Sequence, residues 1–387
     1  MNEVKTVPAR LRVSLDATPL LGQPTGVGAF CQGALQALST RDDLEVGAFA
    51  VSWRRRGEIV AHLPANVLSP QRPMPARPLQ ALWGRVSVPP LEWFIGDVDV
   101  VHGTNFVVPP TRRAGSVVSV HDLTPLHHPE LCNEATLAYP TLIRNAVRRG
   151  SWVHTDSSYV AAEVVEAFAA DPAKVRVVEP GIPPLPNVAP EEARRMVRAL
   201  LPSGVSDYIL AIGTAEPRKD LPGLVRAFDQ LAADHPALGL VLAGPPGWGE
   251  TALTAAIDRA HAASRVLRTG WVDVGVLSAL LKGSSVLAYP SFYEGFGFPP
   301  LQAMAAGIPV VATRAGSLPE ILADGATLVE AGDPEALAGA LDQVLSDDLR
   351  RQELIRRGAA RAAFFSWDRC GTGLAQLYGR VDAERRG

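Results

Sequence analysis

Short hydrophobic runs alternate along the chain with longer stretches in which apolar residues recur every three or four positions. The short runs predict β-strands and the periodic stretches predict helices, an alternation typical of parallel sheets built from βαβ units. In the first half we expect strands at Leu11–Ala17, Glu45–Val51, Val98–Gly103, Val117–His121, Trp152–Thr155 and Val175–Glu179. In the second half we expect strands at Tyr208–Gly213, Gly239–Ala243, Val266–Thr269, Ser285–Tyr289, Val310–Thr313 and Thr327–Glu330. The helical periodicity is found at Leu221–Ala232, Leu253–Ala262, Val276–Leu281 and Pro334–Leu345, among others.

A proline-rich segment separates the two halves. Five of the eleven residues of Pro180–Pro190 are prolines, which excludes a central strand or a helix and predicts a connector. We therefore expect an α/β protein with two Rossmann-like, doubly wound domains, residues 1–182 and 183–363, that face each other across a cleft. A C-terminal helix, residues 364–387, is expected to return to the first domain. Ligands of such sheets bind at the carboxyl ends of the strands.

Composition narrows the possible functions. The 387 residues are 47% hydrophobic and 20% charged, as in globular proteins, and the net charge of −3 gives no electrostatic case for a nucleic-acid partner. The three cysteines, Cys31, Cys132 and Cys370, form no CxxC pair, which argues against a disulfide framework or a zinc site. No apolar stretch has the form of a signal peptide or reaches the roughly 20 residues of a membrane span. We expect a cytoplasmic protein, with contact to the inner face of the membrane left open.

The stretch 51–96 is rich in arginine and tryptophan. It contains six arginines against two acidic residues, with three tryptophans among prolines: Arg54, Arg55, Arg56, Arg72, Arg77, Arg85, Glu58, Glu92, Trp53, Trp83 and Trp93. An irregular surface segment whose tryptophans lie in the core would explain this composition. A basic, aromatic patch that binds an acceptor or a membrane surface is the alternative.

Two segments of the second half carry candidate chemistry. In Gly213–Asp220 (GTAEPRKD), Arg218 and Lys219 follow a strand and precede a helix, where the helix N-terminus and two cations would favour a diphosphate. In Ser291–Gln302 (SFYEGFGFPPLQ), Glu294 follows a strand, and two adjacent glycines allow close approach of a ligand. A solvated charged turn and a helix cap are the respective structural alternatives.

Two segments of the first half are also candidates. His121 and Asp122 end a hydrophobic strand in VSVHDLTPL and would face the cleft, although an isolated histidine there is more often structural. In TGVGAF, Gly26 and Gly28 permit a tight backbone next to a ligand just after the first strand.

In this order along the chain, the four segments resemble the retaining GT-B glycosyltransferases of glycosyltransferase family four. Members of that family carry a Gly-rich loop after the first strand, a strand ending in His-Asp, an EPRK-type loop and an E-x7-E element. The counterparts here are TGVGAF, SVHDLTPL, GTAEPRKDL and Glu294–Gln302, and Thr269–Leu322 is similar to the family pattern nearly throughout. The resemblance implies the GT-B architecture, with residues 1–182 on the acceptor side and 183–363 binding the nucleotide sugar.

The resemblance also implies roles for individual residues. Arg218 and Lys219 would hold the diphosphate as it leaves, His121 would hydrogen-bond the donor sugar, and Glu294 would bind sugar hydroxyls. Gln302 would contact the nucleotide ribose, and Trp271 and Val272 the base. The full substrate-binding set that it implies is Gly26, Gly28, Asp122, Gly213, Trp271, Val272, Gly295, Phe296, Gly297, Phe298 and Gln302.

Three positions depart from the family pattern. Gln302 replaces the second glutamate, Ala29 stands where many members have arginine, and Thr214 takes the place of an arginine found in some relatives. Other motifs are incomplete. Asp97-Val98-Asp99 precedes a buried strand, so we expect no metal there; the loop beginning at Gly26 lacks the third glycine of a dinucleotide fingerprint, and Gly244–Thr251 lacks the lysine of a Walker loop.

The expected function is metal-independent, retaining transfer of a hexose from a nucleotide diphosphate sugar to a glycan, lipid-linked or small-molecule acceptor. By the resemblance we favour mannose, with GDP-mannose as donor, and expect no cofactor. Two alternatives stay open: a sugar-nucleotide epimerase, and a catalytically degenerate GT-B subunit that only binds nucleotide, for which Gln302 is the argument.

Overall fold

The computed structural model describes residues 10–22, 25–70, 72–83 and 86–387. The chain forms two compact units. The first contains the chain up to Leu123 together with Ala138–Gly181 and Phe365–Gly387, and the second contains Thr124–Leu137 and Ile182–Phe364. The units meet in sequence at 181/182, inside the proline-rich connector, next to the division that we expected after residue 182. Thr124–Leu137 groups with the second unit, although the sequence-based division placed it in the first domain.

The first unit is built on one parallel sheet with strand order β2-β1-β3-β4-β5-β6. All six expected strands are present, with ends that differ by at most two residues from the expected ones: β1 (Leu11–Asp16), β2 (Leu44–Phe49), β3 (Val100–Gly103), β4 (Gly115–Val120), β5 (Trp152–Thr155) and β6 (Val175–Val177). Its helices are α1 (Gly26–Ser39), α2 (Ala76–Trp83), α3 (Glu92–Ile95), α5 (Tyr139–Arg148), α6 (Ser158–Phe168) and α15 (Trp367–Arg386). Central strands such as β3 are buried along their whole length because helices cover both faces of a parallel sheet.

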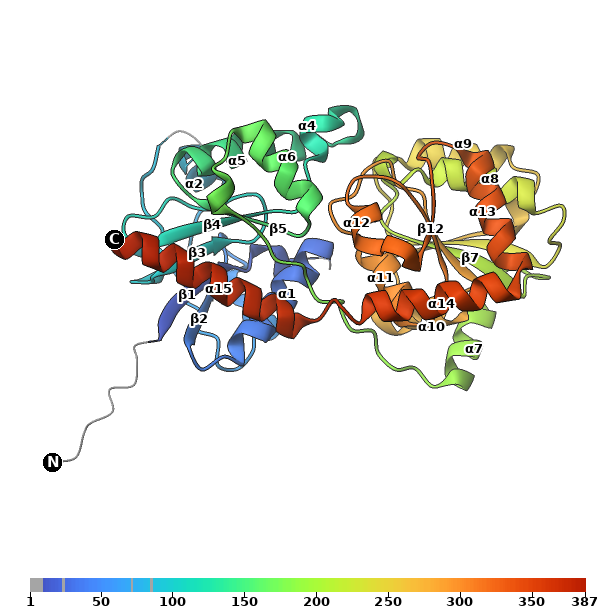
Figure 1. Ribbon diagram of the computed structural model, residues 1–387, viewed down its shortest axis with the longest axis horizontal. Helices are drawn as coiled ribbons and strands as arrows, with labels where there is room; N and C mark the ends of the chain where they lie inside the picture. Colours follow the sequence, from blue (N-terminus) through green and yellow to red (C-terminus); the bar gives the residue numbers. More distant parts are fainter. Residues whose placement is uncertain (1–9, 23–24, 71, 84–85) are drawn as a thin grey trace. The chain divides into compact units, whose positions relative to one another are not determined.

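The second unit has its own parallel sheet with strand order β12-β11-β10-β7-β8-β9. The six expected strands are again present: β7 (Asp207–Ile212), β8 (Leu238–Ala243), β9 (Val266–Gly270), β10 (Val286–Tyr289), β11 (Val310–Thr313) and β12 (Thr327–Val329). The helices are α4 (Thr124–His127), α7 (Pro190–Leu200), α8 (Leu221–Leu231), α9 (Glu250–Arg259), α10 (Val274–Gly283), α11 (Phe298–Ala305), α12 (Leu318–Leu322), α13 (Pro334–Ser346) and α14 (Asp348–Ala362). Helices α8, α9 and α13 cover one face of this sheet, and α11 and α14 the other (Figure 1).

The C-terminal helix α15 belongs to the first unit, where it runs alongside α1 and contacts β3 and β4 (Figure 1). Its first residue, Trp367, lies so close to Gly33 and Gly181 that a methyl group on either glycine would overlap it. Both glycines are therefore explained by the packing of this helix rather than by a ligand.

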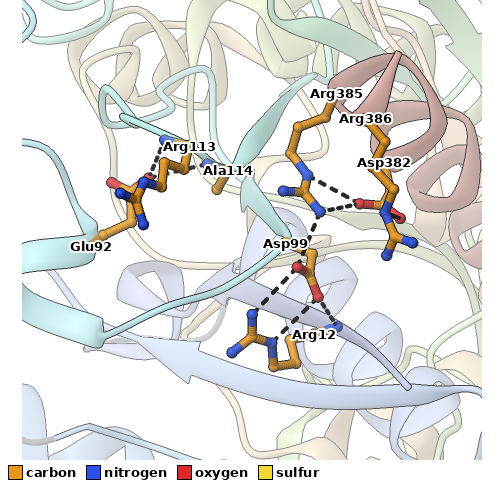
Figure 2. A network of polar contacts seen from close by, with 8 residues as sticks. All are labelled: Arg12, Glu92, Asp99, Arg113, Ala114, Asp382, Arg385 and Arg386. Carbon is orange, nitrogen blue, oxygen red and sulfur yellow. Dashed lines mark hydrogen bonds and ion pairs between the residues drawn. The ribbon is translucent and has the colours of Figure 1, made fainter. Parts of the chain in front are cut away.

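Ion pairs fasten the end of α15 to the start of the sheet (Figure 2). Asp99 lies between Arg12 of β1 and Arg385 of α15, at 3.4 Å and 3.2 Å, and its Oδ2 also accepts a hydrogen bond from the Arg12 backbone N–H at 2.9 Å. Asp382 pairs with Arg385 and Arg386, at 2.5 Å and 2.8 Å. The ion pairs with Arg12 and Arg385 thus give Asp99 of the Asp97-Val98-Asp99 motif a structural role.

The tryptophans of the arginine- and tryptophan-rich stretch 51–96 differ in their exposure to solvent. Trp83 is buried, as a core residue would be, whereas Trp53 and Trp93 are 57% and 61% exposed. Arg85 lies outside the described residues, as does the side chain of Arg77. Within the described part of the chain, no helix combines the length and apolar character needed to cross a bilayer.

Candidate functional site

The loops that follow β7 and β8 touch at two glycines. Gly213 and Gly244 have φ values of +150° and +155°, and a Cβ on Gly244 would lie 2.0 Å from the Gly213 carbonyl oxygen. A side chain on Gly244 would therefore force the two loops apart. A cavity of about 210 Å³, lined by both glycines, Leu221 and Arg268 among others, lies at this carboxyl edge of the sheet. This is the edge at which ligands of α/β sheets bind.

The expected cations lie one turn before a helix. Arg218 and Lys219 belong to a short 3-10 turn, Pro217–Lys219, and α8 begins only after Asp220. Asp220 has a left-handed φ of +42° and caps α8 by accepting a hydrogen bond from the Gly223 N–H at 3.0 Å. Asp220 thus lies between the two cations and the first residue of α8, Leu221. The side chains of the two cations extend to the loop after β10.

Glu294 is held between the two cations. Its Oε2 lies 2.8 Å from Arg218 Nη1, and its Oε1 accepts a hydrogen bond from Lys219 Nζ at 2.6 Å. Arg218 also donates to the Tyr293 carbonyl oxygen at 2.8 Å, and Lys219 donates to the Tyr289 hydroxyl at 2.6 Å. The three charged side chains are only 8% to 16% exposed. The structure thus brings together the Arg218–Lys219 pair and Glu294, which the sequence analysis proposed in two separate segments.

The charges in this cluster support one another. Burial by itself would raise the pKa of Glu294, but Arg218 and Lys219 hold it at about 2, so the group is a carboxylate at neutral pH. Burial lowers the pKa of Lys219 below its ordinary value, and Glu294 opposes that shift. Burial, with Glu294 close by, raises the pKa of Tyr289 well above its ordinary value, so its hydroxyl stays neutral. Glu216 also lies next to the cluster, with its Oε2 3.4 Å from Arg218 Nη2. The two cations therefore face two carboxylates, and their charges are balanced in the structure.

Two residues of this cluster were missed from the sequence. Tyr289, the last residue of β10, contacts Lys219 through its hydroxyl and also lies under the ammonium group, 4.5 Å from the ring centre. Gly316 has a φ of +56°, and a Cβ there would lie 2.2 Å from the Glu294 carbonyl oxygen. The adjacent Ser317 N–H donates to that oxygen at 2.8 Å. The Ala-Gly-Ser sequence just before the Leu318–Leu322 helix was the available signal for Gly316.

The segment after Glu294 forms the start of α11. Gly297 precedes the helix with a φ of +104°, and Phe296 and Phe298 pack edge to face with ring centres 5.3 Å apart. Gln302 lies in α11 and its side-chain amide donates a hydrogen bond to the Pro183 carbonyl oxygen at 3.1 Å. A glutamate could not donate this bond, so the connector gives a structural reason for glutamine here. Contact of Gln302 with a ribose stays a prediction.

His121 of the first unit has both ring nitrogens engaged by the protein. It follows β4 directly and is 9% exposed. Nδ1 lies 2.7 Å from Asp156 Oδ2, and Nε2 lies 2.8 Å from the Thr104 carbonyl oxygen. The expected hydrogen bond from this ring to a donor sugar would require one of these contacts to break, and it stays a prediction. Asp156 and Thr104 were missed from the sequence; each directly follows the carboxyl end of a strand.

The remaining expected residues lie at strand or helix ends. Gly26 opens α1, and the Thr25 hydroxyl caps this helix by accepting from the Gly28 N–H at 3.1 Å. A Cβ on Gly28 would lie 3.1 Å from the Pro19 carbonyl oxygen, so local packing already favours glycine. Asp122 is half-buried at the end of β4. Trp271, 52% exposed, and the half-buried Val272 follow β9.

The expected residues therefore fall into two groups, one in each unit. His121, Asp122, Gly26 and Gly28 belong to the first, and the diphosphate, sugar and base candidates belong to the second. Within the described residues, no group of three or more histidine, cysteine or acidic side chains is arranged to hold a metal ion.

Comparison with known proteins identifies relatives of the chain. Residues 196–361 match the family "Glycosyl transferases group 1". The O-antigen chain mannosyltransferase B of Escherichia coli is 30% identical over 285 residues, which cover 72% of this chain and 74% of that protein. A D-inositol 3-phosphate glycosyltransferase of Salinispora tropica is 34% identical over 242 residues, which cover 58% of this chain but only half of that protein.

A solved structure has the same fold. The crystal structure of Anabaena Alr3699/HepE in complex with UDP and glucose matches with a TM-score of 0.72 and 19% identity, covering 96% of this chain and 100% of that one. At this identity the likeness concerns the fold alone. It confirms the expected α/β class, the GT-B architecture of two Rossmann-like domains.

Proposed function

The chain belongs to the group 1 glycosyl transferases and is a glycosyltransferase, and we propose that it transfers a hexose from a nucleotide diphosphate sugar with retention of anomeric configuration and without a metal ion. The observation that carries this proposal is the cluster of Arg218, Lys219 and Glu294 at the carboxyl edge of the second sheet. A glycosyltransferase that lacks a metal needs cations to stabilise the departing diphosphate, and this cluster contains two.

The cluster suits a diphosphate because its cations already have a partner that a ligand can replace. Arg218 and Lys219 contact different oxygens of Glu294 in the structure. Phosphate oxygens offer charged acceptors of the same kind, and an arginine can bind them with two N–H groups at once. A bound diphosphate would take over part of these contacts and leave Glu294 able to accept hydrogen bonds from sugar hydroxyls.

The proposed reaction needs no protein nucleophile. The bond between the anomeric carbon and the diphosphate oxygen breaks, and the acceptor hydroxyl attacks the same face of an oxocarbenium-like sugar. Its proton passes to an oxygen of the departing diphosphate. Arg218 and Lys219 stabilise the negative charge that develops there, which is the largest contribution expected of the protein.

We favour mannose as the sugar and GDP-mannose as the donor. The support is the 30% identity to an O-antigen chain mannosyltransferase over most of both chains. The solved Anabaena structure is a complex with UDP and glucose, so UDP-glucose is the donor to compare. For the acceptor we propose a glycan, free or lipid-linked, or a small molecule.

A lipid-linked acceptor would agree with one surface of the first unit. Trp53 and Trp93 are exposed. Arg72 lies next to Trp93 and donates a hydrogen bond to its carbonyl oxygen at 2.7 Å. The backbone N–H of Met74 bonds to the Ser52 carbonyl oxygen, which brings the two stretches of chain together. Exposed tryptophans among arginines are typical of surfaces that lie on anionic membranes.

A panel of donors tests the proposal. The chain is incubated with GDP-mannose, UDP-glucose and related donors in the presence of a metal chelator, and release of nucleotide diphosphate and formation of product with candidate acceptors are measured. Transfer in the chelator, with the product in the anomeric configuration of the donor, is the expected result. An inverted product, or a requirement for metal, would contradict the proposal. An altered sugar nucleotide without acceptor would indicate an epimerase. Thermal stabilisation by nucleotide without turnover of any donor would indicate a subunit that only binds.

A further inference from the structure

Three histidines are buried together in the first unit. His102 in β3 and His154 in β5 are fully buried, and His121 follows β4 between them. Phe30 of α1 packs against all three rings, stacked on His154 with centres 5.2 Å apart and edge-on to the other two. Three buried imidazoles can be neutral or charged, and their hydrogen-bond partners decide which.

His102 and His154 belong to a chain of hydrogen bonds that two neutral rings satisfy completely. His154 Nε2 lies 3.0 Å from the Val178 carbonyl oxygen, which can only accept, so this nitrogen carries the proton and Nδ1 accepts from the Ser119 hydroxyl at 2.8 Å. Ser119 in turn accepts from His102 Nε2 at 2.8 Å, and His102 Nδ1 accepts from the Tyr378 hydroxyl at 2.7 Å. Every donor has one acceptor. Burial lowers the pKa of both histidines, in agreement.

His121 differs because both of its neighbours accept hydrogen bonds. Asp156 Oδ2 faces Nδ1 at 2.7 Å, and the Thr104 carbonyl oxygen faces Nε2 at 2.8 Å. Satisfying both contacts with a carboxylate requires a proton on each nitrogen. The alternative arrangement moves one proton to Asp156, but a free imidazole is more basic than a free carboxylate by about 2.5 pKa units. The geometry therefore favours an imidazolium paired with a carboxylate.

The other groups around His121 are compatible with an imidazolium paired with the Asp156 carboxylate. Phe106 packs edge-on with ring centres 5.6 Å apart, and His102 and His154 are neutral. Burial opposes a charge on the ring, but Asp156, the Thr104 carbonyl oxygen and Asp122 together raise the pKa of His121 above its ordinary value. Asp156 Oδ1 is buried without a hydrogen-bond partner among the described residues, and His154 Nε2 is 3.7 Å away from it. Cys370 lies near Asp156, and burial raises the pKa of its thiol, so it stays uncharged.

We propose that Asp156 is a positioning residue that holds His121 as a buried imidazolium, and that His121 contributes to transfer through its fixed position rather than as a base. The part concerning transfer rests on the proposed function. Because both nitrogens are committed, the ring has no lone pair for an acceptor proton. It holds the backbone at the end of β4, where Asp122 follows, against two neighbouring strand ends. This agrees with a mechanism in which the diphosphate oxygen receives the proton.

Nitrogen NMR of ¹⁵N-histidine-labelled protein tests the charge directly. In the wild type between pH 6 and 8, His121 should show two protonated nitrogens, whereas His102 and His154 should each show one, on Nε2. Asp156→Asn should leave His121 with a single proton, on Nε2, because the introduced side-chain amide can donate to Nδ1. A wild-type His121 with one bare nitrogen throughout this range would overturn the charge assignment, whatever the enzyme does.

Kinetics test the positioning role with matched variants. Asp156→Asn should lower kcat about 10- to 100-fold, the range expected when a reacting geometry shifts slightly, and change the donor KM less than about threefold. Asp156→Glu, which keeps the charge, should restore the doubly protonated His121 and part of kcat. Ser119→Ala interrupts only the neutral chain and should stay within about threefold of wild type.

The outcomes separate the two proposals. Asp156→Asn with wild-type kcat and a neutral His121 would overturn the positioning role. If Asp156→Asn does not fold by circular dichroism, the wild-type titration and Asp156→Glu decide: a Glu variant that keeps a charged His121 but gains nothing over Asp156→Ala would overturn it. A wild type that transfers no sugar from any donor refutes the proposed function, while the NMR result still decides the charge of His121.

Discussion

Each unit carries a cluster of polar side chains at the carboxyl edge of its parallel sheet. The two clusters differ in the partners that hold their charged groups. In the second unit, Arg218 and Lys219 share the side-chain carboxylate of Glu294 as partner, and under the proposed function a diphosphate takes over part of these contacts. In the first unit, His121 is held by Asp156 and by a main-chain carbonyl, and both partners lie in the core. The comparison shows that residues at equivalent strand ends can differ in their resting partners. In one cluster two cations share a carboxylate, and in the other an imidazole lies between a carboxylate and a main-chain carbonyl oxygen.

Replacement of Glu294 should have the largest effect. Glu294→Gln removes the anion between the cations, and we expect kcat to fall at least about 100-fold because the sugar loses a charged acceptor in a buried site. Affinity for the bare nucleotide diphosphate should stay equal or rise, since Arg218 and Lys219 lose their competing partner. Calorimetry with nucleotide diphosphate measures this. A parallel loss of that affinity and of turnover would contradict the assignment of Glu294 to the sugar.

Removal of either cation should have the next largest effect. A charged hydrogen bond is worth about 1.5–3 kcal/mol, so Arg218→Ala or Lys219→Ala should lower kcat/KM between about tenfold and several hundredfold. Arg226, exposed on α8, provides a matched control whose alanine variant should behave like wild type. Steady-state kinetics with the best donor decide, and wild-type turnover in both variants would exclude these residues from the site.

Gly316 tests how strongly the second cluster depends on its backbone. A methyl group there would meet the Glu294 carbonyl oxygen and would also require an unfavourable positive φ. We expect Gly316→Ala to lower the free energy of unfolding by about 2 kcal/mol or more and to lower kcat with it. A methyl group on Gly339 in α13 would meet no atom within 4 Å outside its own helix backbone. Gly339→Ala should be neutral or stabilising by up to about 1 kcal/mol. Equal stabilities of the two variants would refute the argument.

The clusters should respond to pH in opposite directions. The pKa of Glu294 is lowered to about 2, so its contribution of about 3 kcal/mol is complete above pH 4.5 and lost as pH falls towards 2. The pKa of His121 is raised, so its contribution is complete below pH 6.5 and is lost as pH rises through the higher folded-state pKa. Chemical denaturation of the wild type, Glu294→Gln and Asp156→Asn across pH tests this. Glu294→Gln should lose only the fall in stability at low pH, and Asp156→Asn only the fall at high pH. A variant that still shows its own pH dependence would contradict the assignment of that dependence to the replaced residue.

Gln302 should show the smallest effect. From ribose chemistry alone, Gln302→Glu should lower the donor KM several-fold at similar kcat, because a carboxylate accepts from both hydroxyls and gains about 1 kcal/mol. The structure adds an opposing cost, since the new carboxylate would face the Pro183 carbonyl oxygen. We expect a lower donor KM together with a loss of up to about 1 kcal/mol in the free energy of unfolding. An unchanged KM would leave Gln302 as an anchor of the connector only.

Much of the fold follows from local patterns in the sequence. All twelve strands were expected within a few residues, because a strand covered on both faces must be a short continuous apolar run and the helices between must be amphipathic. The four candidate segments were found for a related reason. Three of them lie where a strand ends, and in a parallel sheet every such end lies at the same edge. The fourth, TGVGAF, begins the helix that follows β1.

Contacts between distant segments were decided only by the tertiary structure. Nothing near Gln302 in sequence indicates Pro183, and nothing near His121 indicates Asp156 or Thr104, because these partners come from other strands or from the connector. The same holds for Gly316, whose constraint is the backbone of Glu294. Sequence determined which residue types reach the carboxyl edges of the two sheets, since periodicity is local. Only packing determined which hydrogen-bond partners they meet, and those partners shift the pKa values of the charged groups.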